Sequence, residues 1–81
     1  MADDIVEIHL FAAARAAVGA PVVTSQSGAL SAILDRVTVD HPAFAGVRPR
    51  CSYLIDGITA HGDPDVPSGS RVDVLPPFAG G

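Results

Sequence analysis

The sequence predicts a single α+β domain, in which one main helix packs across one face of a mixed sheet of four to five strands. Short runs of alternating polar and apolar residues occur near both ends of the chain and in its second half, as expected for strands. One longer segment repeats its apolar residues at helical spacing. The chain has 81 residues, which suits one domain with one small core.

The first strand is expected at residues 5–11, whose even-numbered apolar side chains would share one face. Residues 12–18 contain strong helix formers and predict one or two helical turns, which Gly19 would end. Residues 21–25 predict a short second strand, antiparallel to the first.

A longer amphipathic helix follows the second strand. Its apolar stripe has the spacing i, i+3, i+4, i+7 and consists of Leu30, Ile33, Leu34 and Val37. Ser25 or Ser27 is expected to cap the start of this helix, and His41-Pro42 is expected to end it. Phe44 and Val47 would then lie in a loop and plug the edge of the core.

The last third of the chain predicts three more strands. Residues 51–60 are expected to form a hairpin around Asp56-Gly57, a dipeptide typical of tight turns. Residues 61–70 indicate a turn-rich loop anchored by Val66, and residues 71–75 form the last strand. With the first and last strands side by side, this order gives the β-grasp arrangement seen in ubiquitin.

The chain ends in a segment that carries the strongest functional signal. Pro76 and Pro77 stop the last strand, because proline lacks the N–H that a sheet requires and favours an extended backbone. We therefore divide the chain into a domain at residues 1–75 and a flexible tail at residues 76–81. The tail can reach roughly 20 Å. It ends in Gly80-Gly81, which is narrow enough to enter a tunnel in a partner and present a carboxylate for chemistry.

Composition excludes several classes of protein. The formal net charge is −4 and the five basic residues are scattered arginines, so the basic stripe that nucleic-acid binding needs is missing. An acidic surface would favour a partner with a basic groove. The single Cys51 excludes an internal disulfide and a multi-cysteine metal site. The acidic start of the chain and the short apolar runs indicate a cytoplasmic protein that does not cross membranes.

The chain resembles the ubiquitin-like sulfur carriers (the MoaD/ThiS family) over essentially its whole length. That family comprises the small subunit of molybdopterin synthase, the thiamine-pathway carrier and relatives used in cysteine synthesis. The most specific stretches are Leu-Pro-Pro-Phe-Ala-Gly-Gly at residues 75–81 and Leu-Phe-Ala-Ala-Ala-Arg at residues 10–15. The Phe11/Arg15 element and the two prolines resemble the molybdopterin synthase subunit more than the thiamine carrier. The turn at residues 67–70 departs from the more acidic turn common there.

The resemblance implies a mechanism in which the chemistry is done by partners. A ubiquitin-activating-type enzyme would adenylate Gly81 with ATP and Mg²⁺, and a sulfur donor would convert it to a thiocarboxylate. The chain itself would bind no cofactor or metal and would not be catalytic alone. It would act as the sulfur-donating subunit of a synthase. Its other partner would be the large subunit of molybdopterin synthase or another sulfur-accepting enzyme.

Three alternatives remain open at this point. The chain could carry sulfur for thiamine or cysteine synthesis. It could be a protein modifier joined through Gly81 to lysines of target proteins. It could also be a binding module whose tail has no chemistry. Because the sequence contains no lysine, the chain could not build isopeptide chains on itself, but this does not exclude the modification of other proteins.

The candidate site residues fall into two groups. Gly81 would be the adenylation and thiocarboxylate site, and Gly80 would keep the tail narrow, because any Cβ would widen it. The predicted partner-binding residues are Phe11, Arg15, Leu54, Leu75, Pro76, Pro77, Phe78 and Ala79. Of these, Phe11, Leu54 and Leu75 are expected to form a docking patch on the sheet face away from the main helix. Scattered surface apolar residues are the ordinary alternative.

Three single residues have competing interpretations. Phe78 could anchor the tail in a partner or fold back onto the sheet. Arg15 could pair across an interface or only solvate a short helix. Cys51 is expected to be a small buried residue rather than a nucleophile.

Overall fold

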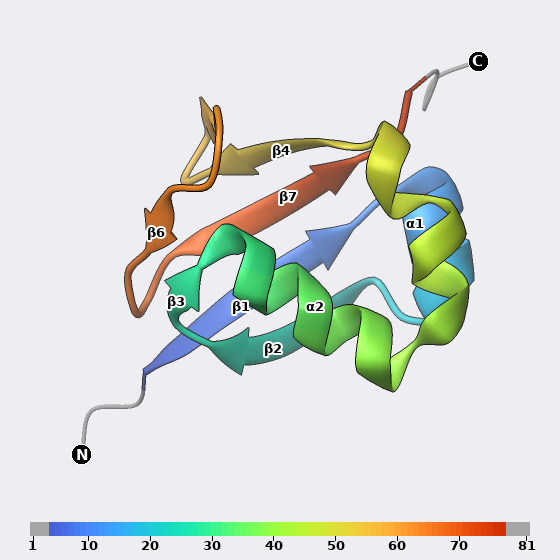
Figure 1. The fold of residues 1–81 in the computed structure, drawn as a ribbon, viewed down its shortest axis with the longest axis horizontal. Helices are drawn as coiled ribbons and strands as arrows, with labels where there is room; N and C mark the ends of the chain where they lie inside the picture. Colours follow the sequence, from blue (N-terminus) through green and yellow to red (C-terminus); the bar gives the residue numbers. More distant parts are fainter. Residues whose placement is uncertain (1–3, 78–81) are drawn as a thin grey trace.

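Five strands form one mixed sheet, and the main helix crosses one face of it (Figure 1). The structure is a computed structural model that describes residues 4–77. In sheet order the strands are β2 (Val22–Gln26), β1 (Ile5–Leu10), β7 (Arg71–Leu75), β4 (Ser52–Ile55) and β5 (Ile58–Thr59). β1 and β7 run parallel at the centre, and the other neighbours in this sheet are antiparallel. This is the predicted β-grasp arrangement.

The hydrophobic core lies between the sheet and helix α2 (Leu30–Asp40). The predicted alternation in β1 is confirmed, because the side chains of Val6, Ile8 and Leu10 are all buried. All four residues of the predicted helical stripe are buried as well. In β7 the same alternation buries Val72 and places its neighbours on the opposite face.

Short helices close the end of the sheet where β1 and β7 finish (Figure 1). Helix α1 (Ala12–Val18) follows β1 and ends at Gly19, whose φ of 86° is the left-handed conformation typical of a helix C-terminus. After α2, two 3₁₀ helices, η1 (Pro42–Gly46) and η2 (Arg48–Arg50), replace the predicted loop. Phe44 in η1 is completely buried, as predicted. In this described part of the chain, no helix is long and apolar enough to cross a membrane.

The prediction for the start of α2 is wrong. The capping position is held by Ala29, and neither Ser25 nor Ser27 provides a side-chain cap. The sequence analysis also missed a second, two-stranded sheet, in which β3 (Gly28–Ala29) pairs antiparallel with β6 (Asp65–Val66). This small sheet brings the loop that precedes β6 against the first turn of α2.

That loop caps α2 from a distance. The carboxylate of Asp63 accepts a hydrogen bond from the backbone N–H of Ser31 (2.8 Å) and another from the Ser31 hydroxyl (2.7 Å). The carbonyl of Pro64 accepts a third from the N–H of Leu30 (2.9 Å). These bonds satisfy two of the four N–H groups that a helix leaves without partners at its start. The backbone bond first, and then the side-chain bond, hold the pKa of Asp63 below its usual 3.8.

We expect the substitution Asp63→Asn to lower the thermal unfolding midpoint at neutral pH. Because the pKa of Asp63 is lower in the folded than in the unfolded chain, its carboxylate stabilises the fold above the unfolded value of 3.8. That stabilisation is lost as the pH falls through the lowered pKa. The difference in midpoint between variant and wild type should therefore shrink on acidification. Thermal scans across pH measure it.

The matched control is Asp65→Asn, since the side chain of Asp65 makes no hydrogen bond or ion pair within residues 4–77. It removes the same charge two residues later, at the start of β6, and should leave the midpoint nearly unchanged. Equal losses for Asp63→Asn and Asp65→Asn would show that net charge, and not capping, sets the effect.

The predicted hairpin between β4 and β5 is confirmed. Asp56 and Gly57 both have positive φ, 48° and 83°, which is the geometry of the tight turn that fits the twist of two strands. The Asp56 carboxylate also accepts a hydrogen bond from the backbone N–H of Arg71 (2.9 Å). The turn is thereby tied to the first residue of β7.

Candidate functional site

The tail starts from a central strand of the sheet. β7 lies between β1 and β4, and its last residue, Leu75, pairs with Ser52 of β4. Pro76 and Pro77 follow it and are the last described residues. The predicted site residues Phe78, Ala79, Gly80 and Gly81 lie outside the described residues. Their roles, and the division of the chain at residues 75 and 76, stay predictions.

The three residues of the expected docking patch lie on the sheet face away from α2. The parallel register of β1 and β7, continued by one residue, sets Phe11 beside Leu75. Leu54 pairs with Asp73 and lies one diagonal step from Leu75. The side chain of Phe11 is exposed, whereas Leu54 and Leu75 are half-buried by their neighbours. The apolar surface is therefore real but small, and Asp73 interrupts it.

Charged side chains lie beside these residues on the outer face of β1 and β7. The Nε2 atom of His9 lies 3.0 Å from a carboxylate oxygen of Glu7, and the Nε atom of Arg71 donates a hydrogen bond to the carboxylate of Asp73 (2.6 Å). The register places Glu7 opposite Arg71 and His9 opposite Asp73. The outer face is thus apolar near the tail and charged towards the beginning of β1 and β7.

Arg15 is exposed on α1, at the same end of the molecule as Pro76. It lies in the last turn of the helix, where a positive charge also favours the helix dipole. Its side chain makes no ion pair with another residue between 4 and 77. Both its predicted interface role and the purely local alternative are compatible with this position.

A hollow of about 470 Å³ opens beside the base of the tail. Its lining comes from α1, from the 3₁₀ helices and from the first tail residues, and consists of Ala13, Gly46, Val47, Arg50, Pro76 and Pro77. Of these residues, only the two prolines were predicted to bind a partner. The one feature of the sequence that could have pointed to the hollow is the Arg48-Pro49-Arg50 run, which holds two of the five arginines within three residues.

The wall of this hollow is fixed to the body of the protein. The hydroxyl of Tyr53 in β4 donates a hydrogen bond to the carbonyl of Arg48 (3.0 Å), and the Arg48 guanidinium donates to Asp35 on α2 (2.8 Å). Cys51 donates from its thiol to the carbonyl of Val47 (3.4 Å). Burial raises the pKa of the Cys51 thiol, which makes it a poor nucleophile, in agreement with the sequence-based interpretation.

We expect the pKa of Tyr53 to reflect the burial of this anchoring side chain. Burial, and then the neighbouring Cys51, raise the pKa of Tyr53 from 10.0 to about 12, against a smaller opposing effect of Arg48. The chain has one tyrosine and no tryptophan, so the phenolate absorbance measures this group alone. A midpoint near 12 in the folded chain is expected, and one near 10.0 in urea.

The same shift has a consequence for stability. Because the folded pKa is raised, folding is favoured while Tyr53 is protonated, and stability should fall as the pH rises from 10.0 towards 12. Tyr53→Phe removes the titrating group and should flatten this part of the profile. A wild-type midpoint close to that of a free tyrosine would contradict the burial of the Tyr53 hydroxyl.

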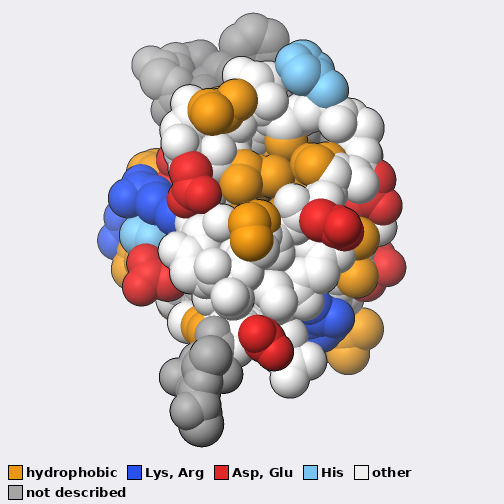
Figure 2. Space-filling model, turned by 90° about the vertical axis from the view of Figure 1, so that its left-hand side faces the viewer, with side chains coloured by type: hydrophobic (Ala, Val, Ile, Leu, Met, Phe, Trp, Pro, Cys, Tyr) orange, Lys and Arg blue, Asp and Glu red, His pale blue; other side chains and the backbone are white. Residues whose placement is uncertain are grey.

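The end of the molecule remote from the tail differs from the base of the tail in its charge. Figure 2 views the side that lies to the left in Figure 1, where acidic side chains surround a group of hydrophobic ones. A shallow pocket there is lined by residues that include Ile58, Pro64 and Asp65, and Ile58 is 73% exposed. Charge is therefore distributed unevenly along the molecule.

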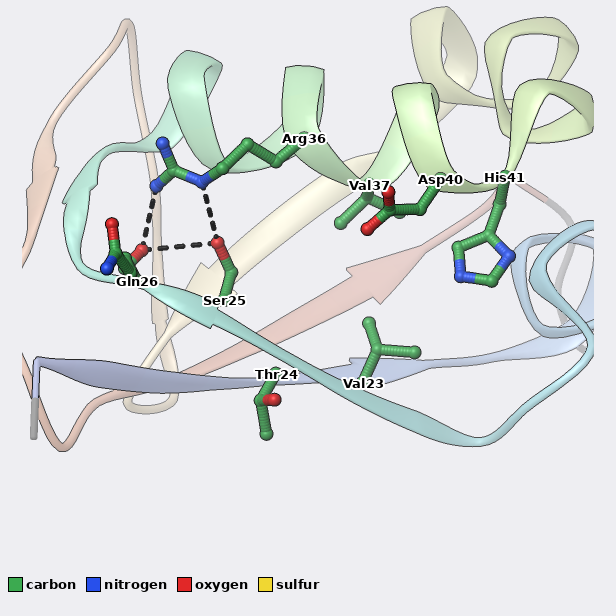
Figure 3. A pocket seen from close by; sticks show the side chains of 8 residues that line it. All are labelled: Val23, Thr24, Ser25, Gln26, Arg36, Val37, Asp40 and His41. Atoms are coloured by element: carbon green, nitrogen blue, oxygen red, sulfur yellow. Dashed lines mark hydrogen bonds between the residues drawn. The ribbon is translucent and has the colours of Figure 1, made fainter.

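The side chains that line a small groove between β2 and α2 hold these two elements together (Figure 3). Arg36 reaches from α2 to β2, where it donates to the hydroxyl of Ser25 (3.0 Å) and to the carbonyl of Gln26 (2.9 Å). Asp40 and His41 lie at the other end of the groove, well away from these bonds (Figure 3). The guanidinium is used to hold the strand against the helix.

Solved structures share this fold. The crystal structure of SAMP1 from Haloferax volcanii is 23% identical with a TM-score of 0.82, and the match covers 95% of this chain and 99% of that one. The solution structure of the small archaeal modifier protein 1 from Methanosarcina acetivorans is 22% identical with a TM-score of 0.83, and covers 100% of both chains. The HVO 2177 protein of Haloferax volcanii is 24% identical with a TM-score of 0.76, over 95% of this chain and 86% of that one.

These likenesses confirm the β-grasp fold. A comparison with curated proteins found no match. The sequence pattern of the ThiS family, however, matches residues 8–81, which extends from the middle of β1 through the terminal glycines. The chain therefore belongs to the ThiS family of small ubiquitin-like sulfur carriers.

Proposed function

We propose that this protein is a sulfur carrier whose working group is the carboxylate of Gly81. The observation that carries the proposal is the family match that runs through to residue 81 and so includes the terminal Gly80-Gly81. The described structure adds a support for the tail, because its base follows directly from the central strand β7. A rigid base and a narrow end suit a group that must be delivered into a partner's active site.

The proposed chemistry has two steps. A carboxylate is a poor electrophile, so an ATP-dependent activating enzyme of the ubiquitin-activating type first adenylates Gly81 and releases pyrophosphate. A sulfur donor at the oxidation level of sulfide then attacks the carbonyl carbon, and AMP leaves. The product is a thiocarboxylate whose sulfur is the nucleophile in the next enzyme. ATP and Mg²⁺ belong to the activating enzyme, and this chain contributes only the positioned terminus.

We assign the small subunit of molybdopterin synthase as the specific role within this chemistry. The support is the Phe11/Arg15 element together with Pro76-Pro77. In this proposal the large subunit docks on the outer-face surface formed by Phe11, Leu54 and Leu75. The tail residues from Pro76 to Ala79 then run into its active site. Supply of sulfur for thiamine or cysteine synthesis would use the same tail with a different acceptor.

A second function, protein modification, is supported by the names of the structural neighbours. Two of the solved structures described above are of small archaeal modifier proteins. A modifier would share the adenylation of Gly81 but would then be attacked by a lysine amine of a target instead of by sulfur. The two functions therefore diverge only after the first step.

The mass of the intact protein from its native host separates them. A population in which one oxygen of Gly81 is replaced by sulfur is expected for a carrier. Only unmodified chains, with Gly81 found instead in isopeptide links to other proteins, would overturn sulfur carriage and favour the modifier. Co-purification of a molybdopterin synthase large subunit would in addition identify the acceptor, and a stable complex with a thiamine-pathway enzyme instead would contradict the specific assignment.

A further inference from the structure

We propose that the hollow beside the tail receives an apolar side chain with a neighbouring carboxylate, presented by the activating enzyme. The occupant is thus a short acidic and apolar segment of the enzyme that adenylates Gly81. This inference rests on the proposed function, which it deepens by naming a second contact between carrier and enzyme. The hollow is defined by its six lining residues, Ala13, Gly46, Val47, Arg50, Pro76 and Pro77.

The size and lining of the hollow suit a side chain. Its volume of about 470 Å³ lies within the range of roughly 300–1,000 Å³ that is typical of ligand pockets. Ala13 and Gly46 have small or no side chains, which keeps the space open between α1 and η1. Val47 and the prolines supply apolar walls. An apolar side chain that enters would lose its contact with water, which favours binding.

The charged residue of the hollow determines which group should accompany the apolar side chain of the partner. Arg50 is its one charged lining residue, and it makes no ion pair with another residue between 4 and 77. Arg48, two residues earlier, is by contrast already paired with Asp35. A carboxylate can therefore form a charge-assisted pair with Arg50, whereas a basic residue would be repelled.

This local charge changes the expectation drawn from net charge alone. The net charge of −4 favours a partner with a basic groove. Acidic side chains do surround the apolar group at the far end of the molecule (Figure 2). At the base of the tail, however, the group available for pairing is a cation, so the complementary partner surface there is acidic.

The position of the hollow restricts the partner to an enzyme that binds the tail, and the activating enzyme is the one such partner that both the carrier function and the modifier function require. Pro76 and Pro77 form part of its wall, and the tail begins with them. An enzyme that binds the tail from its first residue therefore lies next to this opening. A contact in the hollow adds to the contacts that the enzyme makes with the tail. Because the prolines restrict the backbone, the distance between the hollow and the rest of the tail stays nearly fixed.

Adenylation kinetics test the proposal. ATP–pyrophosphate exchange is measured with the host's activating enzyme and the full chain as its substrate. Arg50→Gln removes the cation, and Ala13→Trp fills the hollow from the exposed side of α1. We expect the KM for the carrier to rise roughly tenfold or more for Arg50→Gln, the effect of losing one charge-assisted hydrogen bond. The KM should also rise for Ala13→Trp, because the ring takes the space of the partner's side chain. The kcat should change little, and added salt should raise the wild-type KM but not that of Arg50→Gln.

Two matched variants at the other end of the molecule serve as controls. Arg71→Gln removes the same charge, and Ile58→Trp adds a ring at an exposed position. Both should keep the wild-type KM. The inference is overturned if Arg50→Gln and Ala13→Trp bind as well as these controls. An active wild type with unaffected hollow variants would disprove the docking site and leave the proposed function standing.

A direct probe covers the case in which the wild type supports no exchange, which would count against the proposed function itself. The dipeptide acetyl-Leu-Glu-amide is titrated into the full chain, and amide NMR shifts are followed. Shifts at Ala13, Gly46, Val47 and Arg50 that vanish in Arg50→Gln support the hollow as an acidic-apolar site. No shift, or equal shifts with acetyl-Leu-Lys-amide, overturns it. Shifts of the same amides when the Gly81 carboxylate is converted to an amide would make the chain's own end the occupant and also overturn it.

Discussion

Removal of Gly81 is expected to abolish adenylation of the chain while leaving its folding unchanged. The shortened chain still ends in a glycine carboxylate, but that group is one residue, or about 3.5 Å, short of its place in the activating enzyme. A misplacement of about 1 Å can already reduce a rate roughly 100-fold, so a displacement of a whole residue should leave only background exchange. ATP–pyrophosphate exchange measures the loss, and thermal unfolding verifies that the domain is intact.

Two comparisons make this result specific. Gly81→Ala keeps the length and the carboxylate and adds only a Cβ, so it should lose less than the deletion, by an amount that reports the width of the partner's tunnel. Val39→Ser changes an exposed residue of α2 far from the tail and should exchange like the wild type. Full exchange by the chain without Gly81 would contradict terminal activation and support a binding module whose tail has no chemistry.

Phe44→Ala is expected to cause the largest loss of stability. Phe44 has 0% exposure and fills the space between α2, α1 and the end of the sheet. Truncation of a buried phenylalanine costs about 3–5 kcal/mol. A domain of this size has a free energy of unfolding of roughly 4–12 kcal/mol, at about 0.05–0.15 kcal/mol per residue. The variant should therefore lose a large fraction of its stability, and urea denaturation at low temperature measures the loss.

The control for this variant lies on the opposite side of α2. Val39 is 78% exposed, so Val39→Ala should change stability by no more than about 0.5 kcal/mol. Phe44→Leu keeps most of the buried volume and should fall between the two. If Phe44→Ala lost less than about 1 kcal/mol, the 3₁₀ segment would have to be able to collapse into the space that the ring leaves.

The sequence predicts the parts of this fold in which one face of an element is buried. The alternation of Val6, Ile8 and Leu10 and the stripe on α2 follow directly from the need to cover apolar surface. The hairpin turn is equally local, because the backbone that it needs restricts the choice of residues to pairs such as Asp56-Gly57.

What the sequence did not reveal depends on residues far apart in the chain. The cap on Ser31 comes from Asp63, 32 residues later, so neither Ser25 nor Ser27, the candidates just before the helix, was the capping residue. The positive φ of Ala12, 49°, has no signal within a run of alanines. The hollow beside the tail is likewise formed by three separate segments, and none of them marks it alone. The terminal glycines stand out in the sequence because their proposed function depends only on the chain end itself.

The parallel pairing of β1 and β7 has a practical consequence for anyone who labels this protein. Parallel neighbours start at one end of a sheet and finish at the other, so the chain enters the sheet at Ile5 on the side opposite to the exit at Leu75. An affinity tag, fluorophore or surface linker fused ahead of Ile5 therefore projects from the end remote from Leu75 and leaves the carboxylate of Gly81 chemically unchanged. The same fusion at the other terminus would convert the carboxylate of Gly81 into an amide and would remove the group under study.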